Sequence, residues 1–424
     1  MVPAWVRGAW RESARDIGRL LRAPGPARLA LLASVPSTMA AGLLLPAMPP
    51  YLLQRGFSFA QLGAAYSVLA LTLFLANWAA TRPDSMLGRP TAVLALLWVP
   101  VATYPLFLWV NTPLEFMGLM AVSGLCAAAA APGFQALLAQ AAGERALAAA
   151  YAHWGLLTSL AHAGGLVLGG ILMAHSFRAV FLVASLLSLA AAATALVIGL
   201  PAARTHTNHV ALAGDLERHR RRLAARLPLD GSAVREVACV AVYMFLFTAS
   251  LAVYPVYLPH HFLQRGIPVS WLGVAVASSW VVFGLSQVIG ARWADRTGRH
   301  RAIIAVSLAV SAALNFALAS SSLAVLLAAW ILLGASDGLG RPVTGALVAR
   351  SLPAAHRMRA FAWIGAAASL AGVAAPFGLA VLAGSGGLPA MLVTTSLLLL
   401  AAIVPVLLVG RVPAAVAAEA PNVA

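Results

Sequence analysis

Twelve apolar segments limit what this chain can fold into more than any other feature of its sequence. Each is close to or above the roughly 20 residues that an α-helix needs to cross a lipid bilayer. The composition agrees, because 62% of the 424 residues are hydrophobic and only 9% are charged. The sequence therefore predicts an all-α polytopic membrane protein, with transmembrane helices at about 29–52, 61–81, 90–110, 116–140, 148–173, 179–200, 237–259, 271–294, 302–320, 323–349, 360–384 and 388–410.

The arginines predict the orientation of these helices. All 28 basic residues are arginines, and with the N-terminus inside, 24 of them fall on cytoplasmic loops or tails. Three lie outside, Arg55, Arg178 and Arg265, and Arg341 lies within the membrane. Cytoplasmic loops of membrane proteins are rich in basic residues, so we expect both termini to be cytoplasmic. The same asymmetry accounts for the net charge of +16, and we expect no nucleic-acid partner.

An internal repeat divides the chain into two halves. Residues 53–56, Leu-Gln-Arg-Gly, recur as residues 263–266, and further pairs such as Pro132 and Pro342 keep the same offset of 210. A register kept over many helices indicates a duplicated six-helix unit. The expected division is a cytoplasmic N-terminal segment at 1–28, a six-helix half at 29–200, a cytoplasmic linker at 201–236, a second half at 237–410 and a cytoplasmic tail at 411–424. The N-terminal segment is either an amphipathic helix lying on the inner leaflet or a solvated tail.

The loop after the eighth segment, residues 290–301, reads Gly-Ala-Arg-Trp-Ala-Asp-Arg-Thr-Gly-Arg-His-Arg. As G-x-x-x-x-D-R-x-G-R-x-R, it resembles the signature loop of the major facilitator superfamily of secondary transporters. The resemblance implies twelve helices in two pseudo-symmetric halves and a cytoplasmic latch that breaks when the transporter opens inward. The latch would use Gly290, Asp295, Arg296, Gly298 and Arg299. The alternative is that these arginines only follow the charge bias of cytoplasmic loops.

The first half has a weaker copy of this loop, at residues 82–90. It keeps Asp84, Gly88 and Arg89, but the aspartate is one residue out of register and two prolines flank the stretch. We expect these three residues to contribute to the same cytoplasmic gate, with a weaker latch than in the second half.

Asp337 and Arg341 are an ionisable pair deep in a predicted span. Four residues apart, they lie on one face of the tenth helix. Each charge costs about 2.5 to 3.5 kcal/mol at a helix centre, so a functional role is the default expectation. Burial favours a neutral Asp337, whereas Arg341 favours an ionised one. We expect Asp337 to take up a proton in one facing state and so release Arg341 for the substrate or another acceptor. The alternative is a permanently neutralised buried strut.

The family resemblance implies a substrate site near the membrane midplane, lined by helices 1, 4, 7 and 10. Weaker candidates for the site follow from polar and aromatic residues in the spans. In the fifth helix His153 and His162 lie on opposite faces, and His162 is the better candidate for the cavity. The other candidates, each also explicable as ordinary packing or interfacial anchoring, are Gln135 and Gln140 in the fourth helix, Tyr254 in the seventh and Trp280 in the eighth.

The fifth helix carries a glycine motif at residues 161–170, Ala-His-Ala-Gly-Gly-Leu-Val-Leu-Gly-Gly. It resembles the antiporter signature of drug exporters in the same superfamily, G-x-x-x-G-P-x-x-G-G, with alanine and leucine replacing the first glycine and the proline. The matching glycines are Gly165, Gly169 and Gly170. The resemblance implies export, whereas the alternative is that small residues only let two helices pack closely.

Together these features predict a secondary transporter of the bacterial inner membrane that resembles drug:proton antiporters. We expect it to act as a monomer and to export a small organic molecule, such as a drug, a siderophore or other secondary metabolite, or a sugar, in exchange for protons. The alternative is a proton-linked importer or facilitator of a small anionic nutrient. An enzyme or receptor is disfavoured because no catalytic constellation is visible, and we expect no cofactor and no metal.

Overall fold

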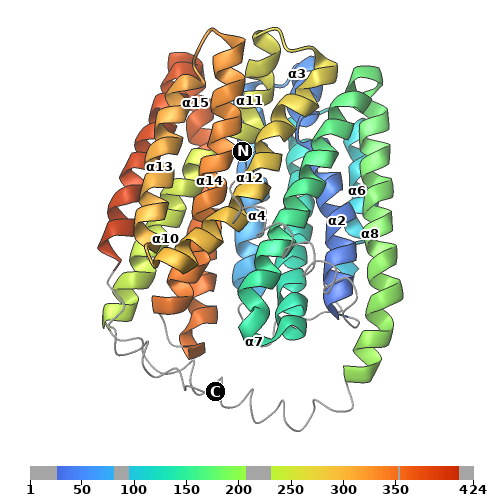
Figure 1. Cartoon of the computed structure of the whole chain (residues 1–424). Helices are drawn as coiled ribbons and strands as arrows, with labels where there is room; N and C mark the ends of the chain where they lie inside the picture. Colours follow the sequence, from blue (N-terminus) through green and yellow to red (C-terminus); the bar gives the residue numbers. More distant parts are fainter. Residues whose placement is uncertain (1–25, 81–94, 207–230, 352–353, 410–424) are drawn as a thin grey trace, which may run out of the picture.

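The computed structural model describes residues 26–80, 95–206, 231–351 and 354–409, and these contain helices and no strand. The helices run roughly parallel to one another in a single bundle (Figure 1). In chain order they are α2 (Pro26–Leu44), α3 (Met48–Gln54), α4 (Phe59–Ala80), α6 (Val99–Leu106), the 3₁₀ turn η2 (Phe107–Trp109), α7 (Pro113–His175), α8 (Phe177–His206), α10 (Gly231–Leu251), α11 (Val253–Gln264), α12 (Val269–Thr297), α13 (His300–Ala317), α14 (Leu323–Ser351) and α15 (Ala354–Leu408).

Ten stretches of helix in the described part of the chain are long and apolar enough to cross a membrane. Two shorter apolar helices, Val99–Trp109 and Pro113–Cys126, fall where the third and fourth spans were predicted. At 1.5 Å per residue, the 63 residues of α7 would form a rod of about 95 Å, three times the thickness of a bilayer core. Figure 1 shows that α7 instead turns back on itself, so that it supplies two neighbouring spans. The predicted all-α membrane fold is therefore confirmed.

Two ends of the bundle can be told apart. We call the end where α8 and α12 finish and α10 begins the loop end, and the opposite end, with the turns at residues 55–58 and 265–268, the turn end. At the turn end the two copies of the repeat have the same backbone geometry. Gly56 has φ +83° and Gly266 has φ +86°, and each follows the last residue of its helix by two positions. The structure thus confirms the repeat at these helix ends, where only glycine adopts such angles without strain.

The first and seventh spans are each broken into two helices, α2–α3 and α10–α11. In the seventh span, α10 ends at Leu251 and Pro255 lies four residues further on. Proline has no N–H to donate to the Leu251 carbonyl, and its ring crowds that oxygen, so the regular helix stops there. The sequence predicts both spans as continuous helices, and the structure corrects this. The break makes α11 a separate helical piece that leads to the turn end.

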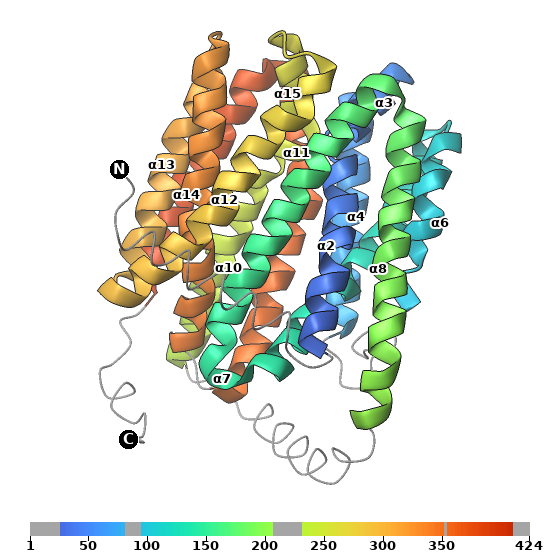
Figure 2. The same ribbon diagram turned by 45° about the vertical axis from the view of Figure 1, so that its right-hand side comes forward.

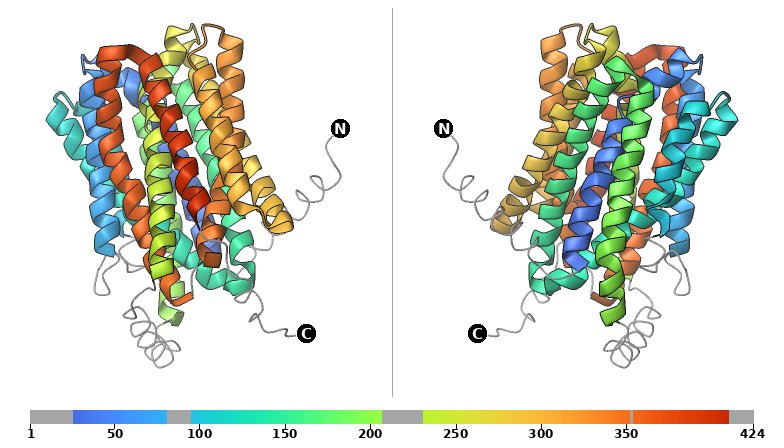
Figure 3. Two further views of the ribbon diagram at one scale, coloured as in Figure 1. Left: turned by 90° about the vertical axis from the view of Figure 1, so that its left-hand side faces the viewer. Right: turned by 90° about the vertical axis from the view of Figure 1, so that its right-hand side faces the viewer.

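The two halves meet along two pairs of helices. Figure 2 shows α7 beside α12, and Figure 3 shows α4 beside α15. Close backbone approaches mark both boundaries, with Gly170 of α7 against Gly273 of α12 and Gly63 of α4 against Pro376 of α15. Helices from different halves therefore pack as tightly as helices within one half.

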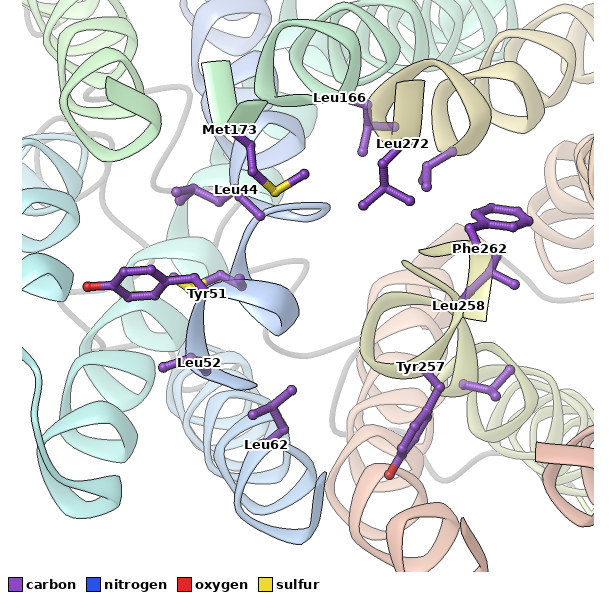
Figure 4. Packing of buried hydrophobic residues seen from close by; sticks show 14 of the residues in the cluster. Leu44, Tyr51, Leu52, Leu62, Leu166, Met173, Tyr257, Leu258, Phe262 and Leu272 are labelled. Atoms are coloured by element: carbon purple, nitrogen blue, oxygen red, sulfur yellow. The ribbon is translucent and has the colours of Figure 1, made fainter. Parts of the chain in front are cut away.

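An apolar core joins the halves at the turn end. It combines residues of the first half, such as Leu62 and Leu166, with Tyr257, Leu258 and Leu272 of the second (Figure 4). A second buried cluster lies among α10, α12, α13, α14 and α15 and contains residues of the second half only. Among the side chains that the structure describes, the apolar contact between the halves is therefore concentrated near the turn end.

Candidate functional site

A cavity of about 290 Å³ lies at the boundary between the halves. Its walls come from the turn between α2 and α3 and from α7, α10, α11, α12 and α14, and most of them belong to the second half. The lining is largely aromatic and aliphatic, with few polar groups. The cavity is lined by Leu45, His162, Phe247, Leu251, Tyr254, Pro255, Pro259, Val276, Ser279, Trp280, Phe283, Trp330, Leu333, Gly334, Asp337 and Arg341.

Asp337 lies in the middle of α14, with only 9% of its surface exposed. Its carboxylate oxygen Oδ1 accepts a hydrogen bond of 2.6 Å from the hydroxyl of Ser311 on α13. A buried carboxylate is costly unless such partners or a nearby cation compensate for the lost water. Within the part of the chain that the structure describes, Ser311 is its hydrogen-bonded side-chain partner.

Arg341 borders the same cavity one turn further along α14. Its guanidinium carbon lies 5.7 Å from the centre of the Phe283 ring, a cation–π contact with α12. Much of the side chain is accessible to solvent, although the residue lies within a span, because it faces the cavity. Among the described residues no ion pair within 4 Å joins Asp337 to Arg341, although the two groups interact electrostatically.

A stripe of buried polar side chains runs along α13, and one of its members, Ser311, bonds Asp337. Ser307, Ser311 and Asn315 are spaced by four residues and are all buried. The amide of Asn315 donates to the Ser311 carbonyl at 3.0 Å, and Tyr254 of α11 donates to the Asn315 side-chain oxygen at 3.0 Å. This stripe was not predicted from the sequence. Polar residues at helical spacing within an apolar span were the signal that could have found it.

Three predicted site residues lie on the cavity wall with Asp337 and Arg341. The His162 ring, from α7, lies 4.2 Å from the ring of Trp280 on α12, and Tyr254 lies 5.3 Å from Trp330. Nitrogen Nε2 of His162 is buried and has no hydrogen-bond partner among the described residues. His162 is thus a polar group that the first half contributes to the cavity. The side chains of Gln135 and Gln140 lie outside the described part of the structure.

The lining differs in part from the set of helices that the family resemblance implies. Residues of the first, seventh and tenth spans contribute, as that resemblance implies, and the fifth and eighth spans contribute as well, including the candidates His162 and Trp280. The fourth span is described with its side chains only as far as Cys126. Because α7 and α12 pack together at the boundary of the halves, α7 presents His162 to the cavity and α12 presents four side chains, Val276, Ser279, Trp280 and Phe283.

The glycine motif of the fifth span is a packing surface. A methyl group at Gly165 would lie 2.1 Å from the Met39 carbonyl oxygen of α2, and one at Gly169 would lie 2.4 Å from the Leu43 carbonyl oxygen. Gly170 lies equally close to α12, with the Gly273 nitrogen 2.6 Å from such a methyl group. The motif therefore brings α7 close to one helix of its own half and to one helix of the other, which is the close packing that such residues permit.

The predicted latch is described only in part. Gly298 ends α12 in the left-handed conformation, with φ +65°, and its N–H bonds the Ala294 carbonyl at 2.8 Å. Gly290 lies against the backbone of Leu339 on α14, and Arg296 and Arg299 are exposed at the loop end. The Asp295 side chain and the first-half residues Asp84, Gly88 and Arg89 lie outside the described part. The turn is therefore as predicted, and the latch stays a prediction.

Comparison with known proteins gives the family. The sequence profile of the Major Facilitator Superfamily matches residues 30–267 and 237–423, which together span most of the chain. The chain belongs to the major facilitator superfamily. A member of this superfamily with these membrane helices is a multi-pass membrane transporter of a small molecule. No curated protein sequence matches the chain.

Solved structures of other superfamily transporters share the fold. The human organic anion transporter MFSD10 (TETRAN) is 18% identical, with a TM-score of 0.63 over 89% of this chain and 98% of that one. A mutant of the nucleoside transporter NupG is 14% identical, with a TM-score of 0.63 over 89% of this chain and 98% of that one. A POT family transporter in complex with a thioalcohol-conjugated peptide is 11% identical, with a TM-score of 0.67 over 89% of this chain and 94% of that one. Identities this low show a common fold and nothing about this superfamily member's substrate.

Proposed function

We propose that this transporter exports a small organic molecule across the bacterial inner membrane in exchange for protons, with the loop end in the cytoplasm. The observation that carries the proposal is Asp337, a carboxylate on the wall of the cavity between the halves that forms no ion pair with Arg341. Among the described residues, one serine hydroxyl is its hydrogen-bonded side-chain partner.

A carboxylate in this position is suited to carry a proton. In an apolar span the ionised form is costly, whereas Ser311 and the positive charge of Arg341 favour it. The balance therefore changes whenever the surroundings of Asp337 change, as they do when a transporter alternates between its two facing states. A group balanced in this way gains a proton on one side of the membrane and loses it on the other.

The cavity bounds the substrate class. Its volume of about 290 Å³ is at the lower end of the range for small-molecule sites. Aromatic rings of α10, α11, α12 and α14 line it, and its polar groups are few. Aromatic side chains bind flat, apolar surfaces well. We therefore propose a small, partly aromatic molecule with one or two polar groups rather than a sugar, whose many hydroxyls would find too few partners here.

The charge of the substrate determines the direction of coupling. A substrate that needs an ionised Asp337 competes with the proton, which gives exchange. An anion held by Arg341 would instead favour a proton on Asp337, so that both move together. This second candidate, proton-linked uptake of an organic anion, is favoured by one observation: the Arg341 guanidinium faces the cavity without a carboxylate partner among the described residues.

Flux in proteoliposomes tests the proposal. A panel of labelled aromatic cations, aromatic anions, neutral aromatic compounds, siderophores and sugars is assayed with a pH gradient of either sign. The wild-type chain is compared with Asp337→Asn and, as a matched control, with Glu115→Gln, because Glu115 is exposed at the turn end. We expect substrate to move against the proton flow, and Asp337→Asn alone to lose the gradient dependence. Undiminished proton dependence in Asp337→Asn would refute the assignment, and movement with the protons would favour anion uptake.

A further inference from the structure

A chain of hydrogen bonds connects Asp337 to the broken seventh span. Ser311 donates to the Asp337 carboxylate at 2.6 Å, the Asn315 amide donates to the Ser311 carbonyl at 3.0 Å, and Tyr254 donates to the Asn315 side-chain oxygen at 3.0 Å. Ser311 and Asn315 are each completely buried. The bonds at Ser311 and at the Asn315 amide nitrogen are therefore shielded from water, which makes their loss more costly, whereas the bond from Tyr254 is partly buried at the edge of the cavity.

The Asn315 amide holds the centre of this chain in one orientation. Its oxygen accepts from Tyr254 while its nitrogen donates to Ser311, so both ends of the amide are committed. The Ser311 hydroxyl, one helical turn away, is in turn aimed at the carboxylate. Loss of the Tyr254 bond would free the amide to rotate and so weaken the placement of Ser311.

Tyr254 is the member of the chain that belongs to a separate helical piece. It lies in α11, three residues after the break at Leu251, and on the wall of the cavity. Of the three bonds, only Tyr254 to Asn315 joins α11 to α13. A displacement of α11 relative to α13, by a substrate in the cavity or by opening of the turn end, therefore strains this bond, together with the bond between His261 of α11 and the Leu318 carbonyl at the end of α13.

Other ionisable groups also face the carboxyl. Tyr243 of α10 and Tyr254 of α11 are close enough to interact with Asp337 electrostatically, and Arg341 lies on its own helix. His162 of α7 lines the same cavity as Asp337, on the side of the first half. Tyrosines stay neutral over the usual range of pH. Arg341 and the hydrogen bond from Ser311 are therefore the main groups that favour the ionised carboxylate.

We propose that Tyr254, Asn315 and Ser311 are positioning residues that link the conformation of α11 to proton uptake by Asp337. With the chain intact, Ser311 holds the carboxylate in its ionised form. When α11 moves, the bond from Tyr254 breaks, Ser311 loses its fixed placement, and Asp337 takes up a proton from water more readily. This inference rests on the proposed role of Asp337, and it explains how a carboxyl on α14 can respond to events at the turn end.

Infrared spectroscopy tests the link without a substrate. The carbonyl stretch of a protonated Asp337 is followed in difference spectra of the full-length protein in lipid as the pH is varied, and it is assigned by its absence in Asp337→Asn. A hydrogen bond to a charged group is worth about 1.5 to 3 kcal/mol, or about one to two pH units. We expect Ser311→Ala to move the midpoint of this band upward by about one unit or more, and Asn315→Leu and Tyr254→Phe to move it in the same direction by less.

Ser307→Ala is the matched control. Ser307 lies on the same stripe of α13, is also buried and bonds the Ser336 carbonyl at 2.5 Å, but it makes no hydrogen bond to Asp337. Its substitution costs a similar bond between α13 and α14 and should leave the midpoint unchanged. Because Tyr254 acts through Ser311, the double variant Tyr254→Phe/Ser311→Ala should shift the midpoint no further than Ser311→Ala alone.

Three results would overturn the inference: an unchanged midpoint in Ser311→Ala, an equal shift in Ser307→Ala, or additive shifts in the double variant. These differ from a failure of the proposed function. If no Asp337 band titrates in the wild-type protein, or if Asp337→Asn keeps proton-coupled flux, the proposed role of Asp337 is wrong and the link has nothing to act on.

Discussion

Gly170 offers a direct test of how the two halves are held together. In Gly170→Ala the added methyl group would lie 2.6 Å from the backbone nitrogen and 2.8 Å from the Cα of Gly273. Both atoms belong to a helix backbone, which cannot rotate out of the way as a side chain can. Ordinary contact needs about 3.4 Å or more, so α7 and α12 must separate by several tenths of an ångström at the turn end. Overpacking of this kind costs about 1 to 3 kcal/mol.

This cost applies to the conformation in which the turn end is closed. When the halves separate there, the clash disappears, so the substitution favours the open form by the same amount. At about 1.4 kcal/mol for each factor of ten, the population of the open form should rise by about 5- to 150-fold. The change should therefore be visible as a shift between two populations rather than as a small change in one distance.

Spin labels measure this shift. Ser176 at the end of α7 and Ser270 at the start of α12 are both exposed at the turn end. Both are replaced by cysteine in a background without Cys126 and Cys239, and the distance distribution between the labels is recorded in lipid. Gly164→Ala is the matched control, because its methyl group would meet no atom nearer than Met39 Cε at 4.0 Å. A distribution that stays the same in Gly170→Ala, or that changes equally in Gly164→Ala, would show that the contact between Gly170 and Gly273 does not hold the turn end closed.

Three further predictions follow from the structure. Gly56→Ala and Gly266→Ala should each lower the free energy of unfolding by about 1 to 2 kcal/mol, because both residues have φ near +85°. A methyl group would meet no atom within 4 Å at either position, so the two losses should be equal. Clearly unequal losses on denaturant titration would contradict the equivalence of the two turns. A membrane-impermeant thiol reagent should label Ser321→Cys on intact cells and Thr297→Cys only after lysis, because exposed Ser321 lies at the turn end and exposed Thr297 at the loop end. The reverse pattern would show that the turn end faces the cytoplasm. His162→Phe keeps a ring beside Trp280 but removes the ring nitrogens, so the variant should fold normally. It should bind the best substrate of the flux panel about 2- to 10-fold more weakly, which corresponds to the loss of one neutral hydrogen bond. Unchanged affinity would show that His162 does not bind the substrate.

The apolar segments and the repeat could be predicted from sequence because they depend on local chemistry. A run of about 20 apolar residues has few alternatives to a membrane helix. Residues 53–56 recur as 263–266, a helix ends within each copy, and Gly56 and Gly266 have nearly the same φ. Asp337 could also be singled out from the sequence, because a carboxylate within a membrane span is costly and usually has a function.

Rotation of each helix about its axis could not be predicted in the same way. It depends on which small residues let which helices approach, and hence on contacts such as Gly170 with Gly273. For this reason only His162 and Trp280 were predicted from the fifth and eighth spans, as weaker candidates, although Val276, Ser279 and Phe283 of α12 also line the cavity. The serine and asparagine of α13 were missed because a hydroxyl or amide costs far less in a span than a charge does, so its position alone says little about its partner. Pro255 indicated a break before Val253, but the apolar residues on both sides of it form one continuous hydrophobic run, which predicts a single helix.

The apolar core that joins the halves at the turn end also makes the resting state of this transporter sensitive to temperature. Opening that end must bring water to surfaces such as those of Leu62, Leu166 and Leu272. Exposure of apolar surface raises the heat capacity, and the stabilisation that burial provides weakens on cooling. The equilibrium between the facing states should therefore curve with temperature. Cooling alone, with no substrate and no proton gradient, should move carriers out of the conformation described here.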